Sequence, residues 1–229
     1  MKIQILGSSS AGNCTIIDDH IMIDFGLQKD LLIPYLKNGI TTLICTHKHG
    51  DHYNSAVINW LKANKPAVYK YGLILNSQCA SLAGVEQTKK RHFFDIRTID
   101  DEYEIYLFPV LHDVECQGMT IFKKSTNELL IYATDLAKLP ELDDINTVLN
   151  HYQRSTFDYI LMEGNYDKQT LVEALQDLEL EDRAVRNLRH LSNDKLLAFV
   201  EQYSNDDTQS YQMHMSEMFG KQVLDRLQQ

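Results

Sequence analysis

The chain has 229 residues, of which 44% are hydrophobic and 24% charged, and its formal net charge is −10 at pH 7. This composition supports a globular core, and we expect a single domain over residues 1–229. The acidic balance argues against a general nucleic-acid coat protein, because phosphate contacts need lysine and arginine, but it leaves a nucleic-acid enzyme open. No apolar run approaches the roughly 20 residues that a membrane helix needs, so no membrane partner is expected.

The N-terminus and the cysteines indicate the compartment. Met1–Leu6 is too short for a signal peptide and has no cleavage-site pattern, so we expect a cytoplasmic protein. The four cysteines lie far apart and form no C-x-x-C pair, which is typical of reduced structural thiols. Cys45 lies two residues before His47, but its apolar neighbours favour a buried strand position over a ligand.

The hydrophobic pattern predicts the following elements in chain order. Strands are expected at Ile3–Leu6, Cys14–Ile17, Ile21–Ile23, Thr41–Cys45, Ala67–Tyr69, Ile105–Val110, Met119–Lys124, Glu128–Ala133, Tyr159–Met162 and Gln209–Met213. Helices are expected at Lys29–Asn38, Ser55–Asn64, Asn76–Gly84, Lys168–Glu179 and Asp194–Tyr203 and after Met213, with a polar loop at Gly7–Asn13. Strands early and late, with helices between them and hairpins in both halves, indicate two mixed sheets packed together with helices outside.

One segment, His47-Lys48-His49-Gly50-Asp51-His52, places three imidazoles and one carboxylate within six residues. An apolar strand ending at Cys45 leads into it, and open α/β sheets carry their chemistry at such strand ends. A solvated loop would explain one stray histidine. It does not explain H-x-H-x-D-H after an apolar strand, which is a spacing typical of metal ligands.

Other strands also end in side chains of the kind that bind metals. These are His112, Asp135, Glu163 and His214. Each alone is weak, because a lone histidine at a strand end is more often a satisfied loop residue, and Glu163 could be a surface carboxylate. Their repeated placement after apolar strands favours one shared site.

These motifs resemble those of the metallo-β-lactamase-fold hydrolases over nearly the whole chain. The resemblance rests on His47–His52, on Asp24 after Met22-Ile23, on His112 after Pro109–Leu111, and on Asp135 after Tyr132–Thr134. More narrowly, Gly7–Cys14, Glu163–Asp167 and His190–Asn193 are similar to the WalJ/YycJ group, and more distantly to RNase Z. The fold so implied is α/β (α+β), a four-layer αβ/βα sandwich of two mixed β-sheets with helices on the outer faces.

The resemblance also implies two divalent metal ions, with Zn²⁺ as the first choice and Mn²⁺ or Fe²⁺ as alternatives. The implied ligands are His47, His49 and His112 for the first ion, Asp51, His52 and His214 for the second, and Asp135 as a bridge. Asp24 would orient the histidine loop from behind. A water molecule bound by two such ions has a pKa near 7, and the hydroxide that it forms would attack in line. Asp51, as an implied ligand of the second ion, is therefore counted among the catalytic residues.

Two late histidines, His190 and His214, compete for the last ligand place. Ligands in this fold come from strand ends, and RNase Z has two late histidines in similar order, so His214 is assigned to metal. His190 then becomes a residue that binds phosphate or donates a proton, oriented by Glu163, which makes both catalytic candidates. The alternative for His190 is an ordinary residue before a helix.

Three arginines, Arg183, Arg186 and Arg189, recur every three residues before His190. In a helix they would share one face, and Arg186 and Arg189 with His190 would bind an anionic substrate. Pairing with neighbouring acidic residues on a solvated face explains the pattern equally well. Lys89–His92 is a weaker basic run, more typical of a solvated segment.

The leading hypothesis is a dinuclear metal-dependent phosphodiesterase that acts on nucleic acid. The chain is too short for the extra inserted domain of larger nucleases of this fold, so we expect loops or the second subunit of a homodimer to supply substrate contacts. A small-molecule hydrolase acting on a lactone, a thioester or a cyclic nucleotide is the alternative, which the net charge of −10 favours. A metal-binding scaffold without turnover is a third, which the apparently complete ligand set opposes.

Overall fold

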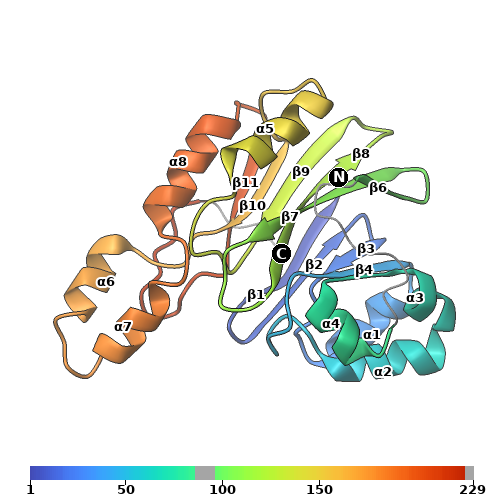
Figure 1. Ribbon diagram of the computed structural model, residues 1–229, viewed down its shortest axis with the longest axis horizontal. Helices are drawn as coiled ribbons and strands as arrows, with labels where there is room; N and C mark the ends of the chain where they lie inside the picture. The colour runs from blue at the N-terminus through green and yellow to red at the C-terminus, as the bar shows by residue number, and fades with distance from the viewer. Residues whose placement is uncertain (86–95, 225–229) are drawn as a thin grey trace. The chain divides into compact units, whose positions relative to one another are not determined.

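The computed structural model describes residues 1–85 and 96–224 (Figure 1). By its internal contacts the chain divides into two compact units, which hold the described residues 1–85 and 96–224 respectively. The expectation of a single domain stays a prediction. None of the described helices is both long and apolar enough to span a bilayer.

The first unit contains a mixed sheet in the order β1-β2-β3-β4-β5. Its strands are β1 (Ile3–Ser9), β2 (Gly12–Ile17), β3 (Ile21–Ile23), β4 (Thr42–Cys45) and β5 (Leu73–Leu75). The first three strands are antiparallel, whereas β3, β4 and β5 run parallel. The parallel pairs bring the carboxyl ends of β3 and β4 to the same edge, so Asp24 and the loop after Cys45 begin as neighbours.

Four helices follow the strands of the first unit. They are α1 (Lys29–Lys37), α2 (Ser55–Asn64), α3 (Pro66–Tyr71) and α4 (Ser77–Ala83). Asn54 caps α2 by accepting a hydrogen bond from the Ala56 amide at 2.9 Å, which satisfies one of the free donors of its first turn. Leu36 of α1 and Val57 of α2 are buried with the strand residue Leu43, so the helices and the sheet share one apolar core.

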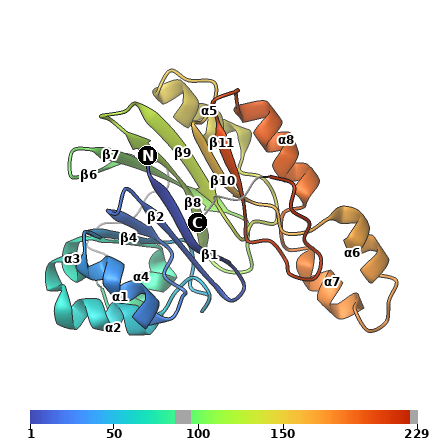
Figure 2. The ribbon, with the colours of Figure 1, turned by 180° about the vertical axis from the view of Figure 1, so that it is seen from behind.

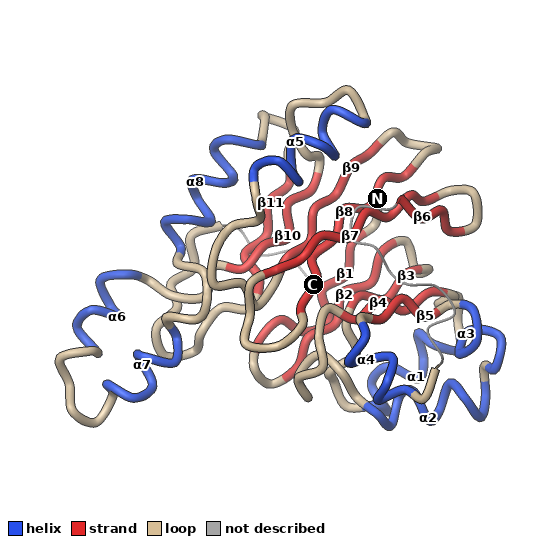
Figure 3. The backbone as a smooth tube through the Cα atoms, in the orientation of Figure 1, coloured by secondary structure: helices blue, strands red, loops and turns tan. Residues whose placement is uncertain are grey.

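The second unit contains a mixed sheet in the order β11-β10-β9-β8-β7-β6, drawn with the other strands in red in Figure 3. Its strands are β6 (Ile96–Ile99), β7 (Tyr103–Val110), β8 (Cys116–Lys123), β9 (Glu128–Ala133), β10 (Tyr159–Glu163) and β11 (Gln209–Met213). The four strands β6 to β9 are antiparallel, and β9, β10 and β11 are parallel. The carboxyl ends of β7, β9, β10 and β11 therefore reach one edge of this sheet.

The helices of the second unit are α5 (Leu142–His151), α6 (Lys168–Ala174), α7 (Glu181–Asn187) and α8 (Asn193–Tyr203). In the views from both sides, α5 and α8 lie side by side against the sheet (Figures 1 and 2). Val148 of α5 and Phe199 of α8 join the strand residues Ile131 and Ile160 in one buried cluster. The shorter pair α6 and α7 packs around its own small core, which includes Leu171, Ala184 and Phe219.

The two mixed sheets with their helices confirm the predicted fold class, but four predicted elements differ. Ala67–Tyr69 lies in helix α3 and not in a strand, because Pro66 at the first helical position presets φ and Tyr69 donates a hydrogen bond to the Ala83 carbonyl at 2.9 Å. The helix from Lys168 ends at Ala174 and not at Glu179. The Asp177 side chain accepts from the Glu179 amide at 2.9 Å, a local bond that competes with helix formation.

The third difference is the predicted terminal helix, which is absent from residues 214–224, the part of the C-terminus that the structure describes. Tertiary partners occupy the backbone there. The Phe219 carbonyl accepts from the Asp167 amide at 2.7 Å, and the Val223 amide donates to Gln212 at 2.8 Å. The expected Gly7–Asn13 loop is also mostly strand, since β1 continues to Ser9 and β2 begins at Gly12.

Candidate metal and active site

The loop after β4 holds its histidines through hydrogen bonds among themselves. Nε2 of His47 lies 3.0 Å from Nδ1 of His49, and Nδ1 of His47 lies 3.0 Å from the Thr46 hydroxyl. Two ring nitrogens at this distance share one proton between them. A cation that displaced this proton would find both lone pairs already directed at it, so the pair fits a metal ion.

Asp24 supports the same loop from the end of β3. Its Oδ1 accepts from the Thr46 amide at 2.8 Å, and its Oδ2 lies 2.7 Å from Nδ1 of His52. A carboxylate only accepts, so Nδ1 of His52 carries the hydrogen and Nε2 keeps its lone pair. A carboxylate that fixes the tautomer in this way is the usual support of a metal-binding histidine.

Asn13, at the start of β2, is a site residue that the sequence analysis missed. Its backbone amide donates to the Asp51 carbonyl at 2.7 Å, and its side-chain Nδ2 lies 2.9 Å from Nε2 of His52. Asn13 is fully buried, so these contacts connect residues 47–52, which we call the ligand loop because the sequence predicts metal ligands in it, to the N-terminal hairpin. The signal in the sequence was a polar residue directly before the apolar run Cys14–Ile17.

Gly26 lets the ligand loop approach the end of β3. A Cβ atom at Gly26 would lie 1.8 Å from the Asp51 carbonyl oxygen and 2.5 Å from the His52 amide nitrogen. Next to it, the Phe25 amide donates to the His52 carbonyl at 2.9 Å. Only glycine allows this approach, because any side chain would displace the backbone of Asp51.

The second unit brings four ligand-type side chains together at one sheet edge. Potential donor atoms of Asp135, Glu163, His190 and His214 lie within 4.8 Å of one another. Asp135 and His214 follow β9 and β11, and Glu163 ends β10 between them, as the parallel register requires. His190 comes from the segment before α8 and not from a strand end.

Glu163 is the central member of this cluster and is fully buried. Its Oε1 lies 2.7 Å from Nδ1 of His190 and 3.3 Å from Nδ1 of His214, and its Oε2 accepts from the Leu136 amide at 2.8 Å. Burial alone would raise the pKa of Glu163, but the bonds from the two histidines outweigh it and lower that pKa. Conversely, burial alone would lower the pKa of His190, whereas the hydrogen bond and charge of Glu163 raise it.

The tautomers that Glu163 fixes decide what the cluster can bind. In its neutral form, with the hydrogen on Nδ1, His214 turns the lone pair of Nε2 towards Oδ1 of Asp135, 3.6 Å away. Two lone pairs that face each other repel, and a cation between them reverses the sign of that interaction. The arrangement of Asp135 and His214 therefore fits a divalent metal ion held by an imidazole and a carboxylate.

Left-handed backbone conformations recur at these strand ends. Asp24, Asp135 and His214 have φ values of 57°, 55° and 48°. Aspartate tolerates this region, but it is unusual for a bulky side chain such as histidine, and such conformations gather at functional sites. The backbone turns sharply after β3, β9 and β11, and these three side chains lie at the turns.

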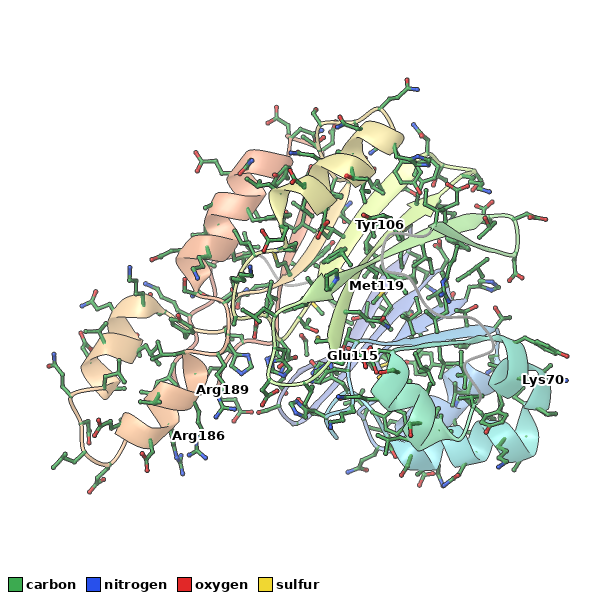
Figure 4. The ribbon with its side chains drawn as sticks, viewed as in Figure 1. Lys70, Tyr106, Glu115, Met119, Arg186 and Arg189 are labelled. Atoms are coloured by element: carbon green, nitrogen blue, oxygen red, sulfur yellow. The ribbon has the colours of Figure 1, made fainter. Side chains whose placement is uncertain are left out.

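His112 follows β7 in the same unit, and an ion-pair chain links it to the arginine segment. Its Nε2 lies 3.1 Å from Oδ1 of Asp113, whose Oδ2 accepts from Arg189 at 3.2 Å. Arg186 lies on α7 and Arg189 beyond its end, as labelled in Figure 4. Arg186 Nε donates to the Asp182 carbonyl at 3.2 Å. The basic run Lys89–His92 lies outside the described residues.

The structure thus places the predicted site residues in two groups, one in each unit. His47, His49, Asp51, His52 and Asp24 form the first group, and His112, Asp135, Glu163, His190 and His214 lie at one edge of the second sheet. Both groups combine buried imidazoles with carboxylates that orient them, which is the chemistry of metal sites.

The fold of the chain is shared with solved metallo-β-lactamase-fold structures. The metallo-β-lactamase fold protein YhfI from Bacillus subtilis has a TM-score of 0.61 at 14% identity, covering 96% of this chain and 87% of that one. The short form of human tRNase Z has a TM-score of 0.59 at 12% identity, covering 95% of this chain and 93% of that one. The chain has the metallo-β-lactamase fold.

Comparison of sequences gives a more specific likeness within the metallo-β-lactamase fold. The exodeoxyribonuclease WalJ of Streptococcus pneumoniae is 23% identical over 236 residues, which cover 94% of this chain and 81% of WalJ. No protein-family model matches the chain. Together, the fold, the likeness to WalJ and the two His/Asp groups indicate a metal-dependent hydrolase.

Proposed function

We propose that this protein is a metal-dependent phosphodiesterase that cleaves nucleic acid, with two divalent ions in its active site. The observation that carries the proposal is the double contact of Glu163 with His190 and His214. This carboxylate orients both imidazole rings through their Nδ1 atoms. Nε2 of one histidine can therefore bind a metal ion, and Nε2 of the other can form a hydrogen bond with the substrate. A bound divalent ion would supply an activated hydroxide and stabilise charge on phosphate oxygens.

The chain's own residues divide the remaining work. Glu163 keeps the Nδ1 proton on His190, and it helps to keep this imidazole protonated, so that its Nε2–H would donate to a phosphate oxygen or to the leaving oxygen. Arg186 and Arg189 lie before His190 and would bind flanking phosphates. Arg189 would exchange its contact with Asp113 for the phosphate, because exposed ion pairs are weak.

The proposed ligand set is the one that the resemblance implies. His47 and His49 offer a pair of mutually directed nitrogens, and Asp135 with His214 offers a carboxylate and an imidazole. The sharing of these side chains and of His112, Asp51 and His52 between two ions stays a prediction. Zn²⁺ suits both donor groups, and Mn²⁺ or Fe²⁺ would suit the carboxylates.

Support for nucleic acid as the substrate comes from the likeness of the chain to WalJ, an exodeoxyribonuclease. The decisive experiment is cleavage of labelled single-stranded and duplex DNA and RNA by metal-loaded protein, with Asp51→Ala as the inactive control. We expect metal-dependent cleavage that Asp51→Ala abolishes. Fully metal-loaded protein that cleaves none of these substrates would disprove the proposal.

Metal content and turnover, measured together, distinguish the role of His190 from that of His214. We expect His214→Ala to lose bound metal, measured by mass spectrometry of the purified protein, whereas His190→Ala should keep it and lose turnover. General acid catalysis by a positioned side chain contributes about 10²- to 10⁴-fold, which sets the expected loss for His190→Ala. The reverse pattern of metal loss would exchange the roles of the two residues.

The alternative is hydrolysis of a small molecule. The formal charge of −10 favours it, because an acidic protein repels a polyanion. A panel that includes a lactone, a thioester, a cyclic nucleotide and bis-p-nitrophenyl phosphate separates the two activities. Preference for the lactone or the thioester over every phosphodiester would support the alternative.

A further inference from the structure

The charges of the chain are divided unequally between its two units. Residues 1–85 carry seven lysines and five aspartates, whereas residues 96–224 carry 11 basic and 24 acidic side chains. The first unit is therefore positive, and the negative net charge comes from the second. Within the first unit, no Asp or Glu occurs between His52 and Val85. A polyanion would meet the least repulsion on the helices that this segment forms.

Three lysines and two tyrosines lie on α2, on α3 and at the residue between them, and we call Lys62, Lys65, Tyr69, Lys70 and Tyr71 the lysine face. Nζ of Lys62 lies over the Tyr69 ring, 5.7 Å from its centroid, and Nζ of Lys70 lies 5.1 Å from the centroid of Tyr71. Lys65 directly precedes α3; its carbonyl accepts from the Tyr69 amide at 3.0 Å, and its Nζ donates to the Lys37 carbonyl at 3.4 Å. The lysine face thus contains two lysine–tyrosine contacts, one between α2 and α3 and one at the end of α3.

The aromatic ring at the end of this surface is open to solvent. Tyr71 is 76% exposed, which is unusual for a ring of this size, and Lys62 and Lys70 are exposed as well. Figure 4 labels Lys70 at the outer edge of the helical layer of the first unit. An exposed ring beside ammonium groups can stack on an unpaired base while the lysines contact phosphates.

The helix dipole offers a simpler reason for part of this pattern. Lys62 and Lys70 lie in the last turns of α2 and α3, where a positive charge offsets the partial negative charge of the carboxyl end. That effect explains one lysine for each helix. It explains neither the absence of carboxylates from His52 to Val85 nor an exposed tyrosine beside the last lysine.

We propose that the lysine face binds single-stranded nucleic acid away from the ligand loop. The inference rests on the proposed nuclease function, for which it supplies a substrate contact. Three lysines would neutralise phosphates, and Tyr71 would stack on one base. Sequence specificity is not expected, because neither kind of contact reads base edges.

The distance between the ligand loop and the lysine face determines how long a bound oligonucleotide must be to contact both. Helix α2 begins three residues after His52 and has 10 residues, so its far end lies about 15 Å along the helix. Stacked nucleotides rise about 3.4 Å each, so about four nucleotides cover that length. Oligonucleotides longer than this should gain affinity from the face, and dinucleotides should not.

The test uses metal-free full-length protein in EDTA, so that binding is measured without cleavage. Fluorescence anisotropy with labelled 20-residue oligodeoxythymidylate compares the wild type with the triple variant Lys62→Gln, Lys65→Gln and Lys70→Gln. The matched control is Lys168→Gln, Lys195→Gln and Lys221→Gln, which removes three exposed lysines from the second unit and changes the net charge equally. Tyr71→Ala tests stacking separately.

We expect the lysine-face variant to bind about 10-fold or more weakly at low salt, and the slope of log affinity against log salt to fall by about 2, because each single-strand phosphate contact contributes about 0.7. Tyr71→Ala should weaken binding about fivefold or more without changing that slope. The control triple variant should bind like the wild type.

Three results would overturn the inference: unchanged binding by the lysine-face variant, an equal loss in the control, or lysine-dependent binding to phosphatidylserine vesicles that exceeds binding to the oligonucleotide. Failure of the proposed function is distinguishable. Wild-type protein that binds through the lysine face but cleaves no phosphodiester would disprove the nuclease and leave the face established. Cleavage of a phosphodiester by the wild type, together with unchanged oligonucleotide binding by the lysine-face variant, would support the nuclease and disprove the lysine-face proposal.

Discussion

Nδ1 of His190 lies 2.7 Å from Oε1 of Glu163, and the same oxygen lies 3.3 Å from Nδ1 of His214. A single carboxylate oxygen thus faces two imidazoles whose rings stack at 5.3 Å between centroids. The Leu136 amide holds the other carboxylate oxygen at 2.8 Å, so Glu163 cannot turn away from either histidine without losing a buried bond.

The first prediction concerns this shared carboxylate. Glu163→Gln keeps the shape of the side chain but replaces the carboxylate by an amide, which no longer favours the charged form of His190. We expect turnover of a phosphodiester to fall about 10²- to 10⁴-fold and metal affinity to fall about 10- to 100-fold, through His214. Calorimetric metal titration and steady-state kinetics measure the two effects. Glu173→Gln, on the exposed side of α6, should change neither.

The second prediction uses two glycines that border the same loop. Gly26→Ala would place a methyl group 1.8 Å from the Asp51 carbonyl oxygen, whereas a Cβ atom at Gly50 would meet no atom within 4 Å. We expect Gly26→Ala to lower the free energy of unfolding by about 3 kcal/mol or more, in the range of severe backbone displacement, and to abolish metal binding.

Gly50→Ala is the matched control, because Gly50 lies inside the histidine run and has no positive φ. Chemical denaturation and metal titration of both variants decide the question. Equal stability of Gly26→Ala and Gly50→Ala would show that the close approach at Gly26 is not needed.

The third prediction concerns Asn13. Removing its amide in Asn13→Ala leaves the buried Nε2 of His52 and the carbonyl of Asp51 without this donor. An unsatisfied buried group costs about 1 to 3 kcal/mol, so the free energy of unfolding of the metal-free protein, measured by chemical denaturation, should fall by that amount. Asn54→Ala removes the cap of α2 and should cost about 1 kcal/mol without changing metal affinity.

The fourth prediction concerns the thiols. All four cysteines are buried, and burial raises the pKa of Cys14 and of Cys45 well above the ordinary thiol value. The thiolate is the reactive form, so native protein should react with a thiol reagent at least about 10-fold more slowly than denatured protein, which should show four thiols. Rapid native labelling of Cys45 or Cys79 would contradict this burial.

Much of the scaffold follows from local pattern. Ser55–Asn64 is predicted with its observed bounds, because Asn54 caps it and its apolar residues repeat at helical spacing. Gln209–Met213 is equally clear. Ala67–Tyr69 was wrong, because β-branched and aromatic residues favour a strand, while the fold packs Tyr69 against the end of α4. Leu142–His151 and Leu73–Leu75 were not predicted.

The candidate site was predicted in its residue types more than in its contacts. The spacing of the histidines and the aspartate in His47–His52 predicted a metal site, and the apolar runs before Asp135 and Glu163 predicted that these two residues lie at strand ends. The predicted contact of Glu163 with His190 is present. Its contact with His214 depends on the parallel register of β10 and β11, which no local pattern encodes. Asn13 was missed for the same reason, because its partners lie 38 and 39 residues away.

The unequal division of charge between residues 1–85 and 96–224 makes added salt act on this protein in two opposite ways. Crowded carboxylates in the second unit repel one another and oppose its compact state, and salt screens that repulsion. Moderate salt should therefore raise the thermal midpoint of the protein while it weakens the proposed binding of nucleic acid to the lysine face. The buffer that best preserves the fold is then a poor one in which to test the proposed binding of nucleic acid.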